Sequence, residues 1–258
     1  MPELPDVETF RRYLNSTALH QDIVGVEVLD ERILDGVWPA RLQRALKGSA
    51  FEQTHRHGKY LFVRVDEAGW LVLHFGMTGY LEYGKERDAG EHDRVIFRFS
   101  QGRSLAYVCQ RLLGKVTLTE TVDAFVESAD LGPDAMEIDE NEFRSRIQGA
   151  GVKSGLMNQK HIAGIGNIYS DEVLFQAHVR PDVRAGHLDE KRLSRLYKTM
   201  RRVLEMATER QADPDRMPRT WLLPNREPGR PCPRCHTEIR KDKMAGRSAF
   251  WCPDCQKA

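Results

Sequence analysis

Four of the five cysteines in this 258-residue chain form two pairs near its C-terminus, and no other feature restricts the fold so tightly. The pairs are Cys232-x-x-Cys235 and Cys252-x-x-Cys255, with 16 residues between them. Each pair can hold one metal ion from a tight turn, and four thiolates close the tetrahedral shell of a structural zinc site. Two disulfides or unrelated thiols are the alternative, which the cytosolic character of the chain disfavours. We therefore expect one structural zinc ion with no open position for catalysis.

The segment between the cysteine pairs predicts a small β-hairpin. Residues 238–240 and 248–251 read as two short strands, joined by residues 241–247 with a basic tip. A module of this size is too small to form a hydrophobic core of its own, so we expect metal binding to drive its folding. The fifth cysteine, Cys109, stands alone, and a buried structural thiol is expected there rather than a reactive one.

The composition narrows the class of protein. With 40% hydrophobic residues, the chain can form two or three small domains with real cores. A net charge of +1 argues against a uniformly basic nucleic-acid binder, so such binding needs a local patch. Residues 219–258 provide one, with nine Lys or Arg and four acidic residues. No apolar run has membrane-spanning length, and residues 1–20 are too charged for a secretory signal, so we expect a soluble cytoplasmic protein.

The residue pattern changes from strands to helices near residues 131–134. Short apolar segments separated by Gly- and Asp-containing turns predict strands at residues 23–29, 60–65, 70–75, 94–99 and 105–108. Several short strands in about 100 residues indicate a two-sheet sandwich or barrel. Helices are predicted afterwards at residues 141–148, 153–158, 168–176 and 189–211. The fold class is therefore α+β with several domains, with a β-sandwich first and a helical domain after it.

A glycine turn precedes the third of these helices. Gly164-Ile165-Gly166-Asn167 can present backbone N–H groups and the Asn167 amide to an anion such as phosphate. Most glycine turns only reverse the chain, so that alternative stays open.

The N-terminus carries a candidate nucleophile. Removal of Met1 would leave Pro2 as a free secondary amine beside the carboxylate of Glu3. An α-amino group titrates near pH ~8 and a lysine amine above ~10, so part of such a proline is uncharged at neutral pH and can attack an electrophilic carbon. The alternative is structural: Pro2 simply follows the initiator, and the acidic residues stabilise the first turn of a helix through residues 8–14.

Five motifs together resemble one known family. In chain order they are Pro2-Glu3-Leu4-Pro5-Asp6-Val7-Glu8, Gly58-Lys59-Tyr60-Leu61, His74-Phe75-Gly76-Met77-Thr78-Gly79, residues 153–169 and the four-cysteine ribbon. Over essentially the whole chain this order resembles the formamidopyrimidine-DNA glycosylase and endonuclease VIII family, and the opening is more similar to the formamidopyrimidine branch. The resemblance implies a catalytic β-sandwich at residues 1–130, a helix-two-turn-helix domain at 131–222 and a zinc finger at 223–258, with a DNA groove between two lobes.

The resemblance also implies an activity, the excision of oxidised bases from damaged double-stranded DNA with lyase cleavage of the strand. In the implied mechanism Pro2 attacks the anomeric carbon of the sugar and becomes an iminium, from which the 3′ and then the 5′ phosphate are eliminated. Glu3 is the acid that opens the sugar ring. Lys59, on the strand after Gly58, binds a phosphate and assists proton transfer, with an ordinary exposed lysine as the alternative. Glu8 either positions the amine or lies on a solvated helix face.

Three residues occupy the family positions that fill the space left by the flipped base: Met77, Arg111 and Leu113. Core packing is the alternative for Met77 and Leu113. An arginine can offer paired donors to the unpaired base. Leu113 replaces a phenylalanine of the family and Cys109-Gln110 replaces Asp-Pro, which leaves the opposite-base preference open.

Four residues are the implied phosphate contacts: Lys59, Lys153, Asn167 and Arg247. Arg247 lies at the expected hairpin tip, where its planar fork suits bidentate binding, and a solvated tip arginine is the alternative.

The substrate is less determined than the chemistry. Residues 211–232 form a shorter stretch than the corresponding region of the formamidopyrimidine branch, where a loop closes over oxidised guanine. We therefore expect a smaller preference for oxidised guanine, with ring-opened purines and oxidised pyrimidines competing well. The competing hypothesis is a catalytically weak or silent zinc-finger DNA-binding protein of the same fold, supported by the altered wedge. A zinc-dependent hydrolase is disfavoured because the four cysteines close the metal site. The resemblance further implies a bacterial monomer, nucleoid-associated when bound to DNA, with no membrane partner.

Overall fold

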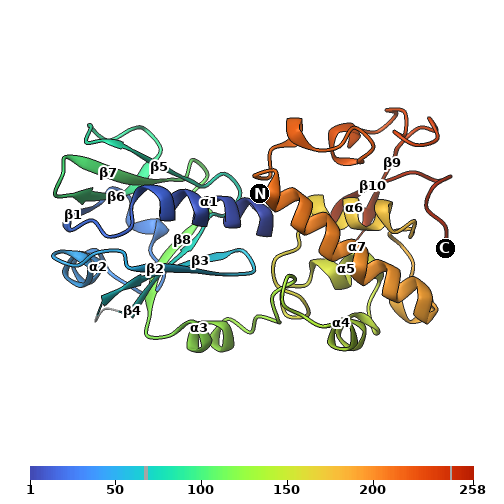
Figure 1. Ribbon diagram of the computed structural model, residues 1–258, viewed down its shortest axis with the longest axis horizontal. Coiled ribbons are helices and arrows are strands. Elements are labelled where there is room, and N and C mark those ends of the chain that lie inside the picture. The colour runs from blue at the N-terminus through green and yellow to red at the C-terminus, as the bar shows by residue number, and fades with distance from the viewer. Residues whose placement is uncertain (67–68, 245) are drawn as a thin grey trace. The chain divides into compact units, whose positions relative to one another are not determined.

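The computed structural model describes residues 1–66, 69–244 and 246–258. It divides into two compact units, which we describe one at a time (Figure 1). The first contains residues 1–2 and 6–129, and the second contains residues 3–5 and 130–258. The predicted zinc finger and the predicted helical domain therefore belong to one compact unit, and the domain boundary expected at residues 222/223 stays a prediction.

The described part of the first unit contains two antiparallel four-stranded sheets. One has the strand order β1 (Ile23–Val28), β6 (Asp93–Phe99), β7 (Arg103–Val108), β5 (Tyr80–Lys85). The other has the order β2 (Gln53–His57), β3 (Tyr60–Val65), β4 (Gly69–His74), β8 (Lys115–Thr119). The helices are α1 (Leu4–Thr17), α2 (Pro39–Leu46) and α3 (Val122–Ser128), with a 3₁₀ turn η1 at Glu31–Ile33. The predicted sandwich is confirmed.

Three strands that the sequence pattern did not predict, β2, β5 and β8, all lie at sheet edges. These edge strands expose more of their side chains and carry fewer apolar residues, so they lack the apolar segments from which strands were predicted. The predicted strands β3, β4, β6 and β7 are more fully buried, and Val95, Phe97 and Phe99 of β6 belong to the core that the sheets share. Cys109 is completely buried in this core, as expected for a structural thiol.

The second unit contains four helices in the described part of the chain. They are α4 (Glu140–Ile147), α5 (Val152–Met157), α6 (Asn167–Gln176) and α7 (Glu190–Glu209), with 3₁₀ turns η3 (Ala185–His187), η4 (Pro214–Arg216) and η5 (Leu223–Asn225). The carboxylates of Asp139 and Asp189 accept hydrogen bonds from the first-turn N–H groups of α4 and α7, which sets where those helices begin. All four predicted helices are confirmed. No helix in the described ranges is both long and apolar enough to cross a lipid bilayer.

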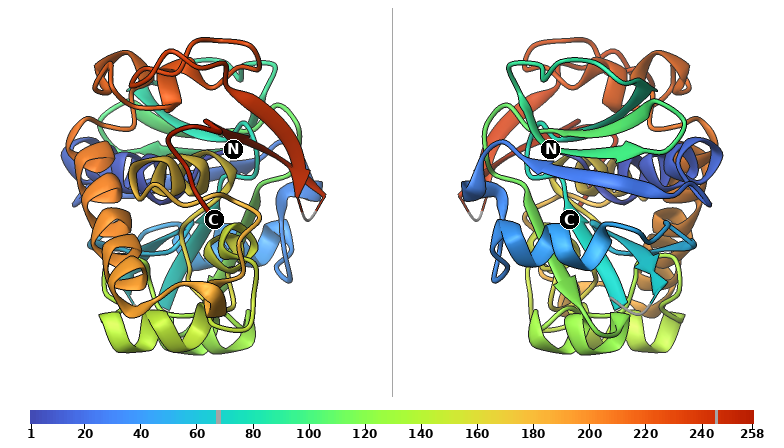
Figure 2. Two further views of the ribbon diagram at one scale, coloured as in Figure 1. Left: turned by 90° about the vertical axis from the view of Figure 1, so that its right-hand side faces the viewer. Right: turned by 90° about the vertical axis from the view of Figure 1, so that its left-hand side faces the viewer.

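Helix α6 is the centre of the second unit. Residues 169–175 of α6 are buried, and the helix packs against α5, α7 and β10 (Arg247–Trp251) (Figure 2). A helix that is buried on all sides must satisfy any polar group it carries within the protein. Ser170, Asp171 and Glu172 lie in this buried stretch, so each requires an internal partner.

The hairpin between the cysteine pairs differs from its prediction in one strand. Strand β9 (Arg240–Met244) pairs antiparallel with β10, with Met244 opposite Arg247. Most of the expected basic loop is therefore strand, because cross-strand pairing with β10 overrides the low strand propensity of a charged sequence. Phe250 and Ile239 pack with Phe175 of α6 and two of the cysteines in a small separate core.

Candidate active site

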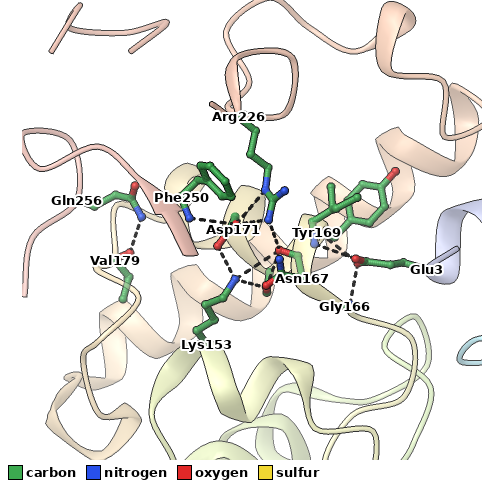
Figure 3. Close-up of polar contacts among 12 residues, drawn as sticks. Glu3, Lys153, Gly166, Asn167, Tyr169, Asp171, Val179, Arg226, Phe250 and Gln256 are labelled. Carbon is green, nitrogen blue, oxygen red and sulfur yellow. Dashed lines mark hydrogen bonds and ion pairs between the residues drawn. The ribbon is translucent and has the colours of Figure 1, made fainter. Parts of the chain in front are cut away.

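Glu3 lies at the N-terminus of α6 and is almost completely buried. Its carboxylate accepts hydrogen bonds from the backbone N–H groups of Gly166 at 2.7 Å, Ile168 at 2.8 Å and Tyr169 at 3.2 Å (Figure 3). Gly166 belongs to the predicted anion-binding turn, and Ile168 and Tyr169 belong to the start of α6, which follows it. The turn thus does bind an anion, but in this structure that anion is the side chain of Glu3.

Two glycines permit this close approach. A Cβ atom on Gly166 would lie 2.4 Å from the carboxyl carbon of Glu3, and one on Gly164 would lie 2.6 Å from Leu4. Gly164 also has φ +118°, which L residues rarely adopt, and its carbonyl accepts the Leu4 N–H at 3.0 Å. The glycines are therefore required by the packing of residues 3 and 4 rather than by chain reversal alone.

Pro2 is half-buried, and in this chain its nitrogen forms the peptide bond to Met1. It can act as an amine only after Met1 is removed. Because Pro2 is covalently next to Glu3, the three bonds that orient the Glu3 carboxylate also restrict where the proline nitrogen can lie.

Lys59 lies in the two-residue turn between β2 and β3, since His57 pairs with Tyr60. The expectation that it lies on a strand is wrong by one position, and the alternative of an exposed lysine is also wrong, because Lys59 is 7% exposed. Gly58 has φ +57°, which a tight hairpin turn requires. The turn, not the strand, therefore determines where the ammonium group lies.

His74 is a candidate site residue that the sequence reasoning missed. Burial, together with the charges of Lys59 and Lys115, lowers the pKa of His74 to about 4. The imidazole is therefore neutral at pH 7 and accepts a 3.4 Å hydrogen bond from the Gly76 N–H at Nδ1. Its place in the His74-Phe75-Gly76 motif was the available sequence signal.

Glu8 is buried, so the alternative of a solvated helix face is wrong. Its carboxylate contacts Arg11 at 2.6 Å, Arg12 at 3.2 Å and Arg56 at 3.4 Å. Burial raises the pKa of Glu8, but the hydrogen bond and charge of Arg11, with help from Arg56 and Arg12, outweigh it and leave the pKa below its ordinary value. The proposed positioning of the amine by Glu8 stays a prediction.

The three predicted void-filling residues lie on neighbouring loops of the first unit. Met77 is 40% exposed and Leu113 is 50% exposed, so core packing is excluded for both. A Cβ atom on Gly76 would lie 2.4 Å from the backbone of Leu113, which shows how closely the two loops approach. The Arg111 N–H donates to the Thr78 hydroxyl at 3.3 Å, and the Arg111 side chain is exposed. We call Met77, Arg111 and Leu113 the exposed trio.

Lys153 is 2% exposed, and its ammonium group is directed into the protein. It donates to Asp171 at 2.5 Å and to Ser170 at 3.0 Å (Figure 3). Asp171 also pairs with Arg226 at 2.8 Å and accepts the Phe250 N–H at 3.2 Å. Burial lowers the pKa of Lys153 and raises that of Asp171, and their mutual attraction opposes both changes. We call Glu3, Lys153, Asp171 and Arg226 the α6 cluster.

The α6 cluster changes the interpretation of two predicted phosphate contacts. Lys153 connects α5 to α6, and through Asp171 to Arg226 and β10. The Oδ1 atom of Asn167 is buried without a hydrogen-bond partner in the part of the chain that the structure describes. An oxygen cannot donate to phosphate, so a contact from Asn167 would have to use its amide nitrogen. The sequence analysis did not predict Asp171 or Arg226 as site residues. The only sequence signal was that Asp171 and Glu172 interrupt an otherwise apolar helix.

A second buried carboxylate holds the short segment before the ribbon. Glu172 accepts the N–H groups of Leu222 at 3.3 Å and Leu223 at 2.7 Å, and the amide of Gln176 at 2.7 Å. Burial raises the pKa of Glu172 to about 7, although these hydrogen bonds oppose the change. Residues 222–223 are therefore attached to the centre of the second unit.

The four predicted metal ligands lie together. The Sγ atoms of Cys232, Cys235, Cys252 and Cys255 are all within 4.8 Å of one another. Contacts between them are 3.4–3.8 Å, far beyond the ~2.05 Å of a disulfide, so the disulfide alternative is wrong. Zinc–sulfur bonds of ~2.3 Å in a tetrahedron separate sulfur atoms by about 3.8 Å. The site fits one structural zinc ion. Arg247 is exposed at the first position of β10, beside the hairpin turn.

Family models match three segments of the chain. The Formamidopyrimidine-DNA glycosylase N-terminal domain matches residues 1–116, and the Formamidopyrimidine-DNA glycosylase H2TH domain matches residues 131–217. The Zinc finger found in FPG and IleRS matches residues 229–258.

Individual relatives match over the whole length. Formamidopyrimidine-DNA glycosylase from Pelotomaculum thermopropionicum is 34% identical over 275 residues, covering 100% of this chain and 99% of the relative. The protein of the same description from Symbiobacterium thermophilum is 36% identical over 273 residues, covering 99% and 89%. MutM in complex with carbocyclic 8-oxo-G containing DNA has a TM-score of 0.90 at 30% identity, with 100% of both chains covered. Lactococcus lactis Fpg with abasic site containing DNA has a TM-score of 0.90 at 29% identity, covering 99% of this chain and 100% of that one.

Proposed function

The chain belongs to the formamidopyrimidine-DNA glycosylase family of DNA repair enzymes, and from this premise we propose that it removes oxidised bases from double-stranded DNA and then cleaves the strand as an AP lyase. The observation that carries the proposal is Glu3, held by three N–H groups of α6 directly beside Pro2 in the chain. This supports the proposal, because an acid with a fixed orientation next to the nucleophile in the chain requires less rearrangement when substrate binds.

The chemistry begins with the uncharged Pro2 amine, formed once Met1 is removed. The nitrogen attacks C1′ of the damaged nucleotide, the base leaves with the electron pair of the glycosidic bond, and Glu3 supplies a proton to the ring oxygen as the sugar opens. A secondary amine gives an iminium, which acidifies the neighbouring C2′. A base removes a C2′ proton, the electron pair of that C–H bond neutralises the iminium nitrogen as an enamine, and the pair then expels the phosphate at C3′. The 3′ phosphate leaves first and the 5′ phosphate second, and water then releases Pro2.

The remaining predicted residues have roles around this centre. Lys59 binds a phosphate and assists proton transfer, and His74, which is neutral at pH 7, can serve there as a hydrogen-bonding group rather than as a cation. The exposed trio fills the space left by the flipped nucleotide, and exposure of Met77 and Leu113 supports this role. Arg247 contacts the phosphate backbone, and Lys153 acts by holding the turn at Asn167.

The zinc ion has a structural role. Four cysteines complete its shell, so it supplies folding energy for the hairpin that carries Arg247 and takes no part in the reaction.

We further propose that the protein acts as a monomer in the bacterial cytoplasm, associated with the nucleoid when bound to DNA. The short stretch of residues 211–232 supports a smaller preference for oxidised guanine than the resemblance of the N-terminus suggests, with ring-opened purines and oxidised pyrimidines competing well. Glu172 holds residues 222–223 of this stretch.

Borohydride trapping tests the nucleophile. Protein shown by intact mass to lack Met1 should become covalently linked to DNA carrying an abasic site, because borohydride reduces the iminium. Pro2→Ala and protein that retains Met1 should trap weakly or not at all. Equal trapping with Met1 retained would contradict the assignment, and intact DNA binding with no trapping in any form would favour the catalytically silent alternative.

Glu3→Gln separates the two steps. Excision of an oxidised base should fall by about 10²-fold or more, because no acid remains to open the sugar. Cleavage of a preformed abasic site should fall less, since its ring already opens in solution. Equal losses on both substrates would show that Glu3 acts through structure alone.

A further inference from the structure

Helix α7 borders an open cavity of about 880 Å³ at the opposite end of α6 from Glu3. Gln176 and His178, at and just beyond the C-terminal end of α6, belong to its lining, whereas Glu3 contacts the N-terminal end. The helix between them has ten residues, which correspond to about 15 Å. The cavity is therefore separate from the candidate active site.

The lining of this cavity is strongly cationic. All ten lining residues are polar or charged, and they include five cations and one carboxylate, Glu190. Four of the cations are the exposed residues Lys191, Arg195, Lys198 and Arg202 of α7, and the fifth is Arg144 of α4. A lining without apolar side chains is unsuited to an apolar peptide segment, and suits a hydrated polyanion.

The four cations of α7 lie on one helix face. Their spacing of four, three and four residues places them in one row, which spans about 16 Å along the axis. One strand of a nucleic acid carries a phosphate every ~3.4 Å of axis, so the row can face on the order of five phosphates. The row therefore matches a charged linear polymer better than a single small anion.

Other cations of α7 are used differently. Arg192 donates to the backbone carbonyls of Lys257 and Ala258, and Arg201 donates to the Met136 carbonyl and lies 3.6 Å from Glu205. Lys191, Arg195 and Arg202 form no ion pair with any residue in the described ranges. Helix α7 thus separates cations that hold the fold from Lys191, Arg195 and Arg202, which line the cavity without an ion-pair partner in the described ranges; Lys198, the fourth cation of the row, is attracted by the Glu140 carboxylate.

We propose that the cavity along α7 is a second binding site for the phosphate backbone of a nucleic acid, independent of base sequence and of the candidate active site. Its ligand is a second segment of DNA, held while the first occupies the active site. Binding of this kind releases counterions and is therefore weak and steeply salt-dependent, with dissociation constants on the order of 10⁻⁴–10⁻⁶ M.

The test uses the zinc-loaded protein saturated with a short duplex that carries a non-cleavable abasic analogue. A second, fluorescent, undamaged duplex is then titrated at several salt concentrations. The wild type should bind it, and R195A/K198A/R202A should bind it at least tenfold more weakly, with a salt slope reduced by about three phosphates' worth. Binding of the first duplex should be unchanged.

Two further variants serve as controls. R41A/R44A/K47A removes two exposed arginines of α2 and the exposed lysine that follows it, and so changes the net charge equally. None of the three lines the cavity along α7, so this variant should bind the second duplex as the wild type does. R195K/R202K keeps the charge and should retain binding. Absence of a second binding event in the wild type, or equal weakening in both triple variants, would overturn the proposal. Unlabelled DNA and polyglutamate are then compared as competitors of the fluorescent duplex. If polyglutamate displaces the duplex at the same concentration as DNA does, the nucleic-acid assignment is overturned in favour of an acidic protein.

Discussion

The α6 cluster and the exposed trio contain residues predicted to serve the same reaction, yet they lie in opposite environments. In the cluster, Asp171 contacts Lys153, Arg226 and the Phe250 N–H, and Glu3 accepts three N–H bonds. In the trio, Met77 and Leu113 are 40% and 50% exposed, and Arg111 is held through its backbone N–H. Burial makes the cluster rigid and intolerant of change, whereas exposure leaves the trio free to adapt.

This difference separates two tasks. The chemistry at Pro2 is common to every substrate and requires fixed geometry, which buried and fully bonded groups provide. Filling the space of a flipped base requires side chains that reach outward and adjust to different neighbours. Substitutions in the α6 cluster should therefore affect stability first, and substitutions in the trio should affect selectivity first.

The largest effect is expected from the metal site, which supports the cluster through β10. Cys235→Ser should lose zinc, and since zinc contributes roughly 10 kcal/mol or more to such modules, the hairpin should unfold. The Phe250 N–H bond to Asp171 would then be lost, and DNA binding should fall. Zinc content and hydrogen exchange of α6 measure this. Cys109→Ala, which removes the cysteine outside the metal site, is the control and should keep its zinc; unchanged exchange in α6 after zinc loss would show that the cluster does not depend on the ribbon.

The next largest effect is expected within the cluster itself. Asp171→Ala leaves Lys153 buried without its carboxylate partner, so the free energy of unfolding should fall by about 3–5 kcal/mol. Lys153→Met with Asp171→Leu should recover part of this loss, because the Lys153 ammonium no longer stays buried without its partner, whereas Arg226 and the Phe250 N–H still lose theirs. Urea unfolding provides the measurement. As a control, Glu227→Ala breaks an exposed ion pair with Arg230 and should lower the free energy of unfolding by less than about 1 kcal/mol. Similar losses for Asp171→Ala and Glu227→Ala would contradict the prediction that buried ion pairs matter more than exposed ones.

Glu172 gives the buried region a pH dependence that the exposed trio lacks. Its pKa is about 7 in the folded protein against an ordinary value of 4.5. Between these values the folded state retains a proton that the unfolded state releases, so stability should decrease as pH rises from 4.5 to 7. The decrease attributable to this group is roughly 3 kcal/mol. Unfolding measured across this range should show a smaller decrease for Glu172→Gln, and identical pH profiles would contradict the assignment.

The smallest effect on stability is expected in the trio. Leu113→Ala and Leu113→Phe should each change the free energy of unfolding by about 0.5 kcal/mol or less, because the side chain is half exposed. Single-turnover excision should change more, with the phenylalanine variant altering the ratio of rates for different opposite bases. Leu29→Ala, at another exposed leucine, should alter neither quantity. A large loss of stability at Leu113 would place it in the fold rather than in DNA binding.

The sequence predicted best where the physics is local. Strands β3, β4, β6 and β7 were expected because each is a short segment rich in apolar residues, whereas β2 and β5 contain too many polar residues to form such a segment. Strand β8 was missed although Val116 and Leu118 alternate with polar residues. Lys59 was assigned to the strand, but it is the last residue of the turn before β3, which begins at Tyr60. In a short apolar segment, the sequence does not distinguish the end of a tight turn from the start of a strand. The exposed trio was identified by its motifs, and only exposure excluded core packing.

The sequence by itself determined the zinc site, the two-sheet region followed by helices, and the pairing of Pro2 with Glu3, because each depends on neighbours within a few residues or on a regular period. The tertiary structure decided what the polar groups contact. It brought Glu3 to N–H groups 163–166 residues away, and it turned Lys153 toward Asp171 and away from solvent. Burial creates these partnerships, since a charged group removed from water must find an internal partner, and the chain segment that supplies it is set by packing rather than by any local pattern.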